Sequence, residues 1–156
     1  MARKTFQEKL NSSGDLPKIV RIDDPKGAAR LGKEPGCLML IAPALDYDVL
    51  MRLIPEGKLA TSEQMRAQLA RLAGADAVCP LTAGIFINVV AHASEERAGV
   101  DPVPWWRTLK GRGELNPKYP EGVLLQKGLL ESEGHVITQK GNRFFVQDYE
   151  QSLYAF

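Results

Sequence analysis

Cysteine, histidine and tryptophan are scarce in this chain, which has 156 residues and two of each. Cys37, Cys79, His92 and His135 do not have the spacing of a zinc site, and we expect no metal and no cofactor. One disulfide is possible by count, but the N-terminal residues contain no apolar signal core. We therefore expect a protein of the reducing cytoplasm.

Long apolar runs and a strong charge of one sign are also missing. No run approaches the roughly 20 residues of a membrane-spanning helix, so no membrane partner is expected. A hydrophobic fraction of 44% and a charged fraction of 25% are typical of a soluble globular protein. The net charge of +1 says little about partners, because nucleic-acid-binding proteins often concentrate their charge locally.

The N-terminal residues are locally basic and rich in proline. Residues 1–33 contain the basic residues Arg3, Lys4, Lys9, Lys18, Arg21, Lys26, Arg30 and Lys33, and the acidic residues Glu8, Asp15, Asp23 and Asp24. Pro17, Pro25 and Pro35 interrupt regular structure. We expect a basic arm over residues 1–36, irregular beyond a short helix at 5–10 and draped over a single domain of residues 37–156.

Two elements are expected at the start of that domain. The apolar run 37–41 predicts a buried strand. Asp46 or Asp48 can cap a helix that ends at the turn 55–57. The apolar positions of this helix are Val49, Leu50, Leu53 and Ile54.

Two helices joined by a short turn follow. Thr61 and Gln64 form a capping box that opens the first helix, Gly74 ends it, and Pro80 begins the second. The positions expected to face the core are Met65, Leu69 and Leu72, then Leu81, Ile85, Phe86, Val89, Val90 and Ala93. This pattern indicates a helix-turn-helix, although an ordinary helical hairpin is at least as common.

The C-terminal part predicts a short helix at 122–133 and a β-hairpin. Two strands, 135–139 and 143–147, flank a Lys-Gly-Asn turn. The hairpin is either a wing beside the helix-turn-helix or a lid over the core. We therefore expect an α/β fold, a winged-helix-like helix-turn-helix domain with a short C-terminal β-hairpin and no parallel sheet. Residues expected to be buried together are Leu69, Leu72, Ile85, Phe86, Val89, Leu129 and Leu130.

The most unusual stretch is 104–107, which reads Pro-Trp-Trp-Arg and holds both tryptophans. Indole rings stack on bases or pack in cores, and arginine binds phosphates or carboxylates. Lys110, Arg112 and Lys118 follow and make the neighbourhood basic. Two interpretations are open: an aromatic pocket with a cationic rim, or one tryptophan in the core and the other half-exposed on a turn.

Catalytic constellations are not apparent. No Ser-His-Asp, phosphate-loop or paired-carboxylate spacing is present. Cys79 directly precedes Pro80 at an expected helix start, where a helix dipole can activate a thiol. The simpler interpretation of Cys79 is a small residue packed at the joint between the two helices. We therefore expect that the protein is not an enzyme.

The order of these features resembles the DNA-binding domain of the O6-alkylguanine DNA alkyltransferase family over roughly residues 45–135. The matching residues are Ile54-Pro55-Glu56-Gly57-Lys58, the two helices, Pro104-Trp105-Trp106-Arg107, Gly113, Gln126, Leu129-Leu130-Glu131 and Glu133-Gly134. The family's active-site stretch is Pro-Cys-His-Arg-Val, and its cysteine accepts an alkyl group from a flipped-out guanine. Trp105 stands here in place of the cysteine and Trp106 in place of the histidine. A tryptophan at the cysteine position marks the alkyltransferase-like branch, which binds alkylated bases without repairing them.

The resemblance also implies site residues. It places Trp105, Trp106 and Arg107 in a base pocket, Lys110, Arg112 and Lys118 on the DNA backbone, and Thr82, Gly84, Ile85 and Asn88 on the recognition helix. Two further family residues are replaced. The recognition-helix arginine that fills the place of the extruded base corresponds to Gly84 or a neighbour, and a tyrosine near the start of the first helix corresponds to Ser62.

We therefore expect a non-enzymatic protein that binds double-stranded DNA, recognises bases of the O6-alkylguanine type and flags them for a repair-pathway protein. One alternative is a protein-interaction or regulatory module that kept the fold without DNA binding. The other is a methyltransferase that uses a displaced nucleophile, Cys79. The basic arm favours DNA binding, whereas the missing recognition-helix arginine favours the interaction module.

Overall fold

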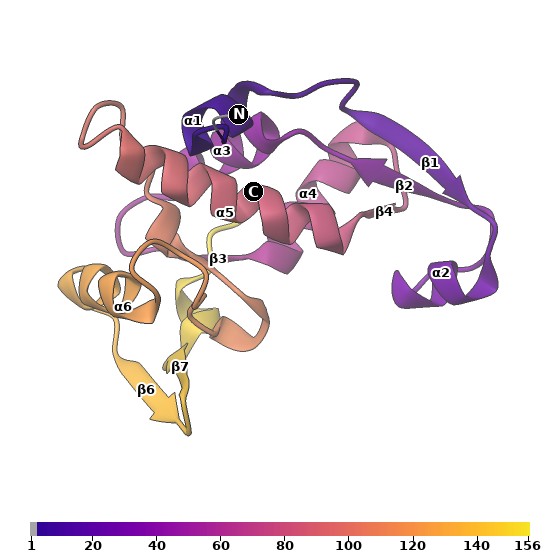
Figure 1. Cartoon of the computed structure of the whole chain (residues 1–156). Coiled ribbons are helices and arrows are strands. Elements are labelled where there is room, and N and C mark those ends of the chain that lie inside the picture. Colours follow the sequence, from indigo (N-terminus) through magenta and orange to yellow (C-terminus); the bar gives the residue numbers. More distant parts are fainter. Residues whose placement is uncertain (1–2) are drawn as a thin grey trace.

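The computed structural model describes residues 3–156 and contains both helices and small sheets (Figure 1). The helices are α1 (Phe6–Asn11), α2 (Pro25–Arg30), α3 (Ala44–Leu53), α4 (Ser62–Ala73), α5 (Pro80–Glu96) and α6 (Val123–Ser132). The strands are β1 (Lys18–Ile22), β2 (Cys37–Ile41), β3 (Ala60–Thr61), β4 (Ala77–Val78), β5 (Thr108–Leu109), β6 (Ile137–Lys140) and β7 (Arg143–Val146). The predicted α/β class is confirmed.

Helices α1, α3 and α4 all pack against helix α5 (Figure 1). Near its C-terminal end, the Glu96 carboxylate accepts hydrogen bonds from the backbone amides of Phe6 and Gln7, at 3.0 and 2.9 Å. The Phe6 ring stacks on His92 with the ring centroids 4.5 Å apart. Helix α1 is thereby fixed against α5, and the two amide donors lower the pKa of Glu96.

The expectation of no parallel sheet is wrong, because two of the sheets contain parallel pairings. β2 pairs antiparallel with β1 and parallel with β4, and β3 pairs parallel with β5. Each parallel pairing joins only two residues of each strand, too few to leave a pattern in the sequence. The β3–β5 pairing matters for function because it holds the segment after the two tryptophans beside the start of α4.

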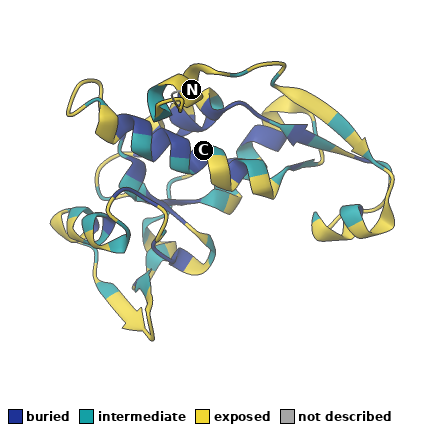
Figure 2. Cartoon of the chain, viewed as in Figure 1, coloured by how far each residue is buried: buried dark blue, intermediate teal, exposed yellow. Residues whose placement is uncertain are grey.

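The expectation of an irregular arm over most of residues 1–36 is wrong. The predicted helix at its start is present as α1, but β1 and α2 follow it, and all five residues of β1 pair with β2. Helix α2 lies at the far end of this β-ribbon and is mostly exposed (Figures 1 and 2). The strand was missed because most of β1 is solvent-exposed, so it has no clear apolar alternation.

The core was predicted in part. Leu69 and Val89 are buried in one cluster around α3, α4 and α5, while Leu130 is buried in a second cluster with the hairpin residue Val146. Phe86 and Leu129 are half-buried. The predictions for Leu72, Leu81 and Ile85 are wrong, since these side chains are 63%, 73% and 50% exposed. Leu72 lies beside the hollow between α3 and α4, and Ile85 lines the cavity described below.

Several local signals formed as predicted. Thr61 and Gln64 make both hydrogen bonds of the capping box at the start of α4, and Gly74 ends that helix with φ of 68°. The strand at 37–41, the helix near 122–133 and the C-terminal hairpin are present as β2, α6 and β6–β7. The predicted cap of α3 is wrong, because the helix begins two residues before Asp46, with Pro43 as the N-cap.

The hairpin packs on the turn at 111–113 and the residues that follow it. Arg143 donates hydrogen bonds to Glu114 at 3.0 and 2.6 Å, and the amide of Leu115 donates to Phe144. Helices α4 and α5 have the order and short joint of a helix-turn-helix. The assignment of the hairpin as the wing of a winged helix stays a prediction.

Candidate nucleic-acid interface

Trp105 is a core residue in this structure. It begins a 3₁₀ turn (Trp105–Arg107), and its side chain has no exposed surface. Its indole Nε1 donates a hydrogen bond to Glu95 at 3.0 Å. The ring packs edge-on against Tyr119 and Trp106, with centroid distances of 5.1 and 5.8 Å. A base cannot stack on Trp105 in this arrangement. The position of Trp105 fits the second interpretation of the tryptophan pair, in which one ring lies in the core and the other is half-exposed.

Trp106 and Arg107 are tied to α6 through Glu133. The carboxylate accepts hydrogen bonds from Trp106 Nε1 at 2.8 Å, Arg107 Nη2 at 2.8 Å and the Gly57 amide at 3.1 Å. The Arg107 and Glu133 side chains are only 13% and 5% exposed, so this is a buried ion pair. Arg107 also donates to the Ile54 carbonyl at 2.8 Å. Its guanidinium is thus occupied within the protein rather than presented to a phosphate.

The pKa of Glu133 reflects this environment. Burial alone would raise the pKa, but hydrogen bonds from Arg107, Gly57 and Trp106 outweigh it and leave the pKa below its ordinary value. The carboxylate is therefore ionised at neutral pH, and it balances the guanidinium charge. The Trp-Trp-Arg segment is anchored by this pair.

Gln126 orders the backbone that follows the tryptophans. Its side chain is fully buried, its Nε2 donates to the carbonyls of Trp106 and Thr108, and its Oε1 accepts from the Asn116 amide. Asn116 in turn donates through Nδ2 to Asn88 on α5 at 3.0 Å. These bonds hold the loop at 110–119 facing the N-terminal half of α5.

A cavity of about 370 Å³ lies where this loop faces α4 and α5. It is lined from the start of α4, from one face of α5 and from the loop itself. The lining residues are Ser62, Glu63, Arg66, Pro80, Leu81, Gly84, Ile85, Ile87, Asn88, Leu109, Lys110, Gly111, Asn116, Pro117, Lys118 and Tyr119. Trp105 does not line it, but it packs against Tyr119, whose hydroxyl donates to the Thr108 carbonyl at 3.0 Å.

The predicted recognition-helix residues are largely brought together at this cavity. Gly84, Ile85 and Asn88 line it, as does Ser62, the residue at the position of the family's tyrosine. Thr82 does not, and its hydroxyl donates to the Cys79 carbonyl at 3.3 Å.

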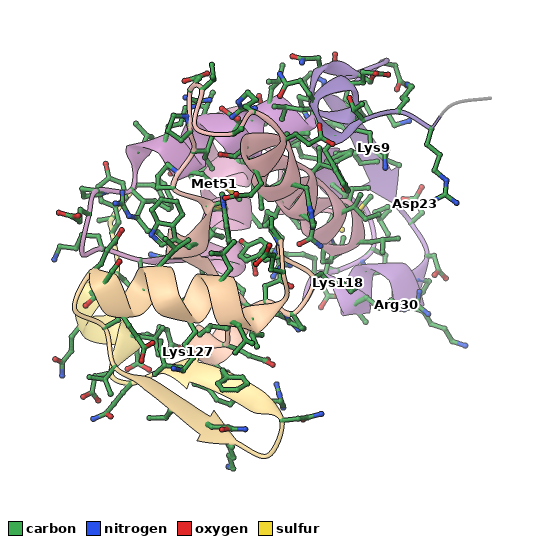
Figure 3. The ribbon with its side chains drawn as sticks, turned by 60° about the vertical axis from the view of Figure 1, so that its left-hand side comes forward. Lys9, Asp23, Arg30, Met51, Lys118 and Lys127 are labelled. Carbon is green, nitrogen blue, oxygen red and sulfur yellow. The ribbon has the colours of Figure 1, made fainter. Side chains whose placement is uncertain are left out.

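Of the three residues predicted to contact the DNA backbone, two line the cavity. Lys110 and Lys118 are exposed and line it, and Figure 3 shows Lys118 on a different part of the surface from Lys127 of α6. Arg112 is exposed beside a separate hollow that it shares with the hairpin residues Lys140 and Arg143. None of Lys110, Arg112 and Lys118 forms an ion pair within residues 3–156.

The turn that carries Arg112 requires a glycine at position 113. Gly113 has φ of 78°, and a Cβ there would lie 2.4 Å from the Tyr149 ring. A Cβ at Gly111 would lie 2.8 Å from the Glu63 carboxylate. The turn therefore packs closely on its neighbours. This packing explains why a glycine stands at position 113, one of the positions that carry the family resemblance.

Sequence reasoning missed most of the other residues that line the cavity, among them Arg66, Asn116 and Tyr119. Arg66 lies one turn after Ser62 on α4, so helical spacing from Ser62 was an available signal. Tyr119 and Asn116 reach the cavity through the path of a turn-rich loop, and no periodic pattern marks such a path.

The two thiols lie outside the cavity. Cys37 is buried in β2 and Cys79 is half-buried at the N-cap of α5, and neither lines the cavity or forms a disulfide. Across residues 3–156, no cluster of three or more His, Cys, Asp or Glu side chains is placed to hold a metal ion. In the same part of the chain, every helix is too short or too polar to cross a bilayer.

Comparison with known proteins identifies the fold. No protein-family model matches the chain, and no curated protein matches it. Similar solved structures include S. pombe Atl1 in complex with damaged DNA containing O6-carboxymethylguanine, at 23% identity and a TM-score of 0.53. They also include S. pombe ATL in complex with DNA, at 24% identity and the same TM-score. Each match covers 71% of this chain and 93% of the other chain.

The chain shares the fold of S. pombe Atl1. This likeness agrees with the alkyltransferase-like resemblance, which was carried by the turn at 55–57, the two helices and the Trp-Trp-Arg segment, and with the expected α/β class.

Proposed function

We propose that this protein binds double-stranded DNA, recognises an alkylated base of the O6-alkylguanine type without repairing it, and marks the lesion for a repair-pathway protein. The base is taken out of the duplex and held in the cavity between α5 and the loop at 110–119. The protein belongs, on this proposal, to the alkyltransferase-like branch.

The observation that carries the proposal is the composition of the cavity. Residues chosen from the sequence as recognition helix (Gly84, Ile85 and Asn88) and as phosphate contacts (Lys110 and Lys118) line one hollow. Its volume of about 370 Å³ lies within the range of roughly 300–1,000 Å³ that is typical of small-molecule sites. The similar S. pombe Atl1 structure holds damaged DNA containing O6-carboxymethylguanine, which supports a damaged base as the occupant here.

The residues of the Trp-Trp-Arg segment take supporting roles in this proposal. Trp105 has no nucleophilic atom, and its fully buried ring supports Tyr119 from behind. Trp106 and Arg107 fix the segment to α6 through Glu133. The base then contacts the lining contributed by α5 and the loop at 110–119, because Trp105 is fully buried and Tyr119 is only 2% exposed.

The chemistry available at the cavity supports binding without alkyl transfer. Transfer to protein requires a thiolate close to the alkyl group, and neither Cys37 nor Cys79 lines the cavity. The exposed cations provide the other part of the function, because Lys110 and Lys118 on the rim and Arg112 nearby attract the phosphate backbone.

An electrophoretic shift assay followed by mass spectrometry tests this proposal. Duplexes that differ only in one O6-methylguanine are titrated with protein at fixed salt, and the mixture is then analysed for methylated protein. We expect a tighter shift with the lesion duplex and no methyl adduct. A methyl group on Cys79 would support the methyltransferase alternative, and no shift with either duplex would support the interaction module.

A further inference from the structure

Two large apolar side chains project from α5 at the mouth of the cavity. Leu81 is 73% exposed and Ile85 is 50% exposed, and both line the cavity. They are four residues apart on one helix, so they lie on the same face, one turn from each other. Exposed apolar side chains that gather beside a cavity are typical of a contact surface rather than of an ordinary protein exterior.

The helix surface beside this pair is open. Gly84 precedes Ile85 and has no side chain, and no atom lies within 4 Å of the place where its Cβ would be. Leu81 and Ile85 are therefore the large side chains that α5 presents at the cavity mouth, with Asn88 tied to Asn116 one turn further on.

The charges around the cavity indicate what covers the apolar pair. Arg66, Lys110 and Lys118 line the cavity with one carboxylate, Glu63. An apolar protein surface would leave these basic side chains without partners. A duplex satisfies both features, since its phosphates pair with the basic residues while its stacked bases accept the apolar ones.

The physical need for an apolar wedge follows from base extrusion. A base that leaves the duplex also leaves a gap, and the neighbouring base pairs close that gap unless another group occupies it. Proteins that unstack DNA often insert Leu, Ile, Phe, Met or Pro side chains between base steps. Such side chains must be exposed before binding and must lie beside the pocket that receives the base, as Leu81 and Ile85 do.

We propose that Leu81 and Ile85 form an apolar wedge that enters the base stack and holds open the gap left by the extruded base. The proposal rests on the proposed function, because it assumes that the cavity receives a base. It adds the residues that hold the duplex open. Gly84 cannot do this, because it has no side chain.

The test compares duplex with single-stranded DNA. A single strand that contains the same O6-methylguanine has no paired stack to be held open, so a wedge contributes only on the duplex. We expect the paired substitution Leu81→Ser with Ile85→Ser to weaken binding to the lesion duplex by about tenfold or more. Because Ile85 also lines the cavity, binding to the single strand should weaken as well, but by a clearly smaller factor than binding to the duplex. The single-strand binding that remains also shows that the variant is folded. A 2-aminopurine placed next to the lesion should brighten less with the variant than with the wild type.

Two further variants complete the experiment. Leu124→Ser removes an equally exposed leucine, 71% accessible, from α6 and should leave both affinities unchanged. Ile85→Met keeps an apolar side chain and should retain duplex binding.

Each other result overturns the wedge. Equal losses on duplex and single strand would place the two side chains in contact with the base instead of the stack. No loss on either substrate, while the wild type binds the lesion duplex, would leave the proposed function standing without the wedge. If the wild type binds neither substrate, the proposed function and the wedge fail together.

Discussion

The buried ion pair between Arg107 and Glu133 allows a quantitative prediction for Glu133→Gln. Glutamine has the shape of glutamate but no charge, so Arg107 would be left without a partner charge. With only 13% of its side chain exposed, Arg107 could not be compensated by water. Trp106 would also lose a charged acceptor for its indole N–H.

The magnitude follows from the burial of the pair. Removal of one partner of a buried ion pair costs about 3–5 kcal/mol, and the remaining amide oxygen places this variant near 3 kcal/mol. For a chain of this size, each kcal/mol corresponds to a shift of about 2–4 °C, which gives a melting temperature lower by about 6–12 °C. The matched control is Glu131→Gln, which breaks the exposed pair with Lys127 and should cost less than about 1 kcal/mol.

The pH dependence supplies the check on mechanism. Because the pKa of Glu133 is lowered in the folded protein, its contribution to stability is fully present above the ordinary glutamate value of about 4.3. The contribution is lost as the pH falls through the folded value. Melting curves followed by circular dichroism should therefore show the full difference at pH 7 and a shrinking difference as the pH falls below about 4. A difference that is below 1 kcal/mol at pH 7, or constant across this range, would refute the reasoning.

Four other predictions concern the cavity and its surroundings. Lys118→Ala should reduce the slope of log affinity against log salt by about 0.9, because it removes one phosphate contact. Lys127→Ala makes the same change in net charge and should leave the slope unchanged. Equal slopes for the two variants in DNA titrations would contradict a phosphate contact by Lys118. Gly84→Arg adds a cation where no atom obstructs it, so DNA affinity should rise and the salt slope should steepen. Trp105→Ala should cost about 3–5 kcal/mol in urea unfolding because the ring is fully buried, and a cost below 1 would argue against a core role. Cys79 should carry no methyl group by mass spectrometry after incubation with O6-methylguanine duplex.

Signals that act within a few residues were readable from the sequence. The capping box at Thr61, the stop at Gly74 and the glycine turn of the hairpin each specify backbone geometry through neighbouring groups, and all three formed. The candidate site was also predicted in part, since three of the four predicted recognition-helix residues and two of the three predicted cations line one cavity. Here the resemblance supplied the positions, and the fold brought them together.

Features set by contacts between distant segments could not be read in the same way. Trp105 and Trp106 are adjacent and chemically alike, yet the first is fully buried and the second half-buried. The difference arises because the residues that surround them, Glu95, Tyr119 and Glu133, come from other segments of the chain. Ile85 fits the apolar stripe of α5 by spacing but faces a cavity made by a loop that starts 25 residues later, at Lys110.

The central claim, recognition of an alkylated base, is tested most directly by the ratio of two dissociation constants. Fluorescence anisotropy gives the Kd for a duplex with one O6-methylguanine and for the same duplex with guanine, at one physiological salt concentration. Because each phosphate contact is common to both duplexes, the ratio isolates the contribution of the base in the cavity. We predict that the lesion duplex binds at least about tenfold more tightly. Equal Kd values would contradict the account.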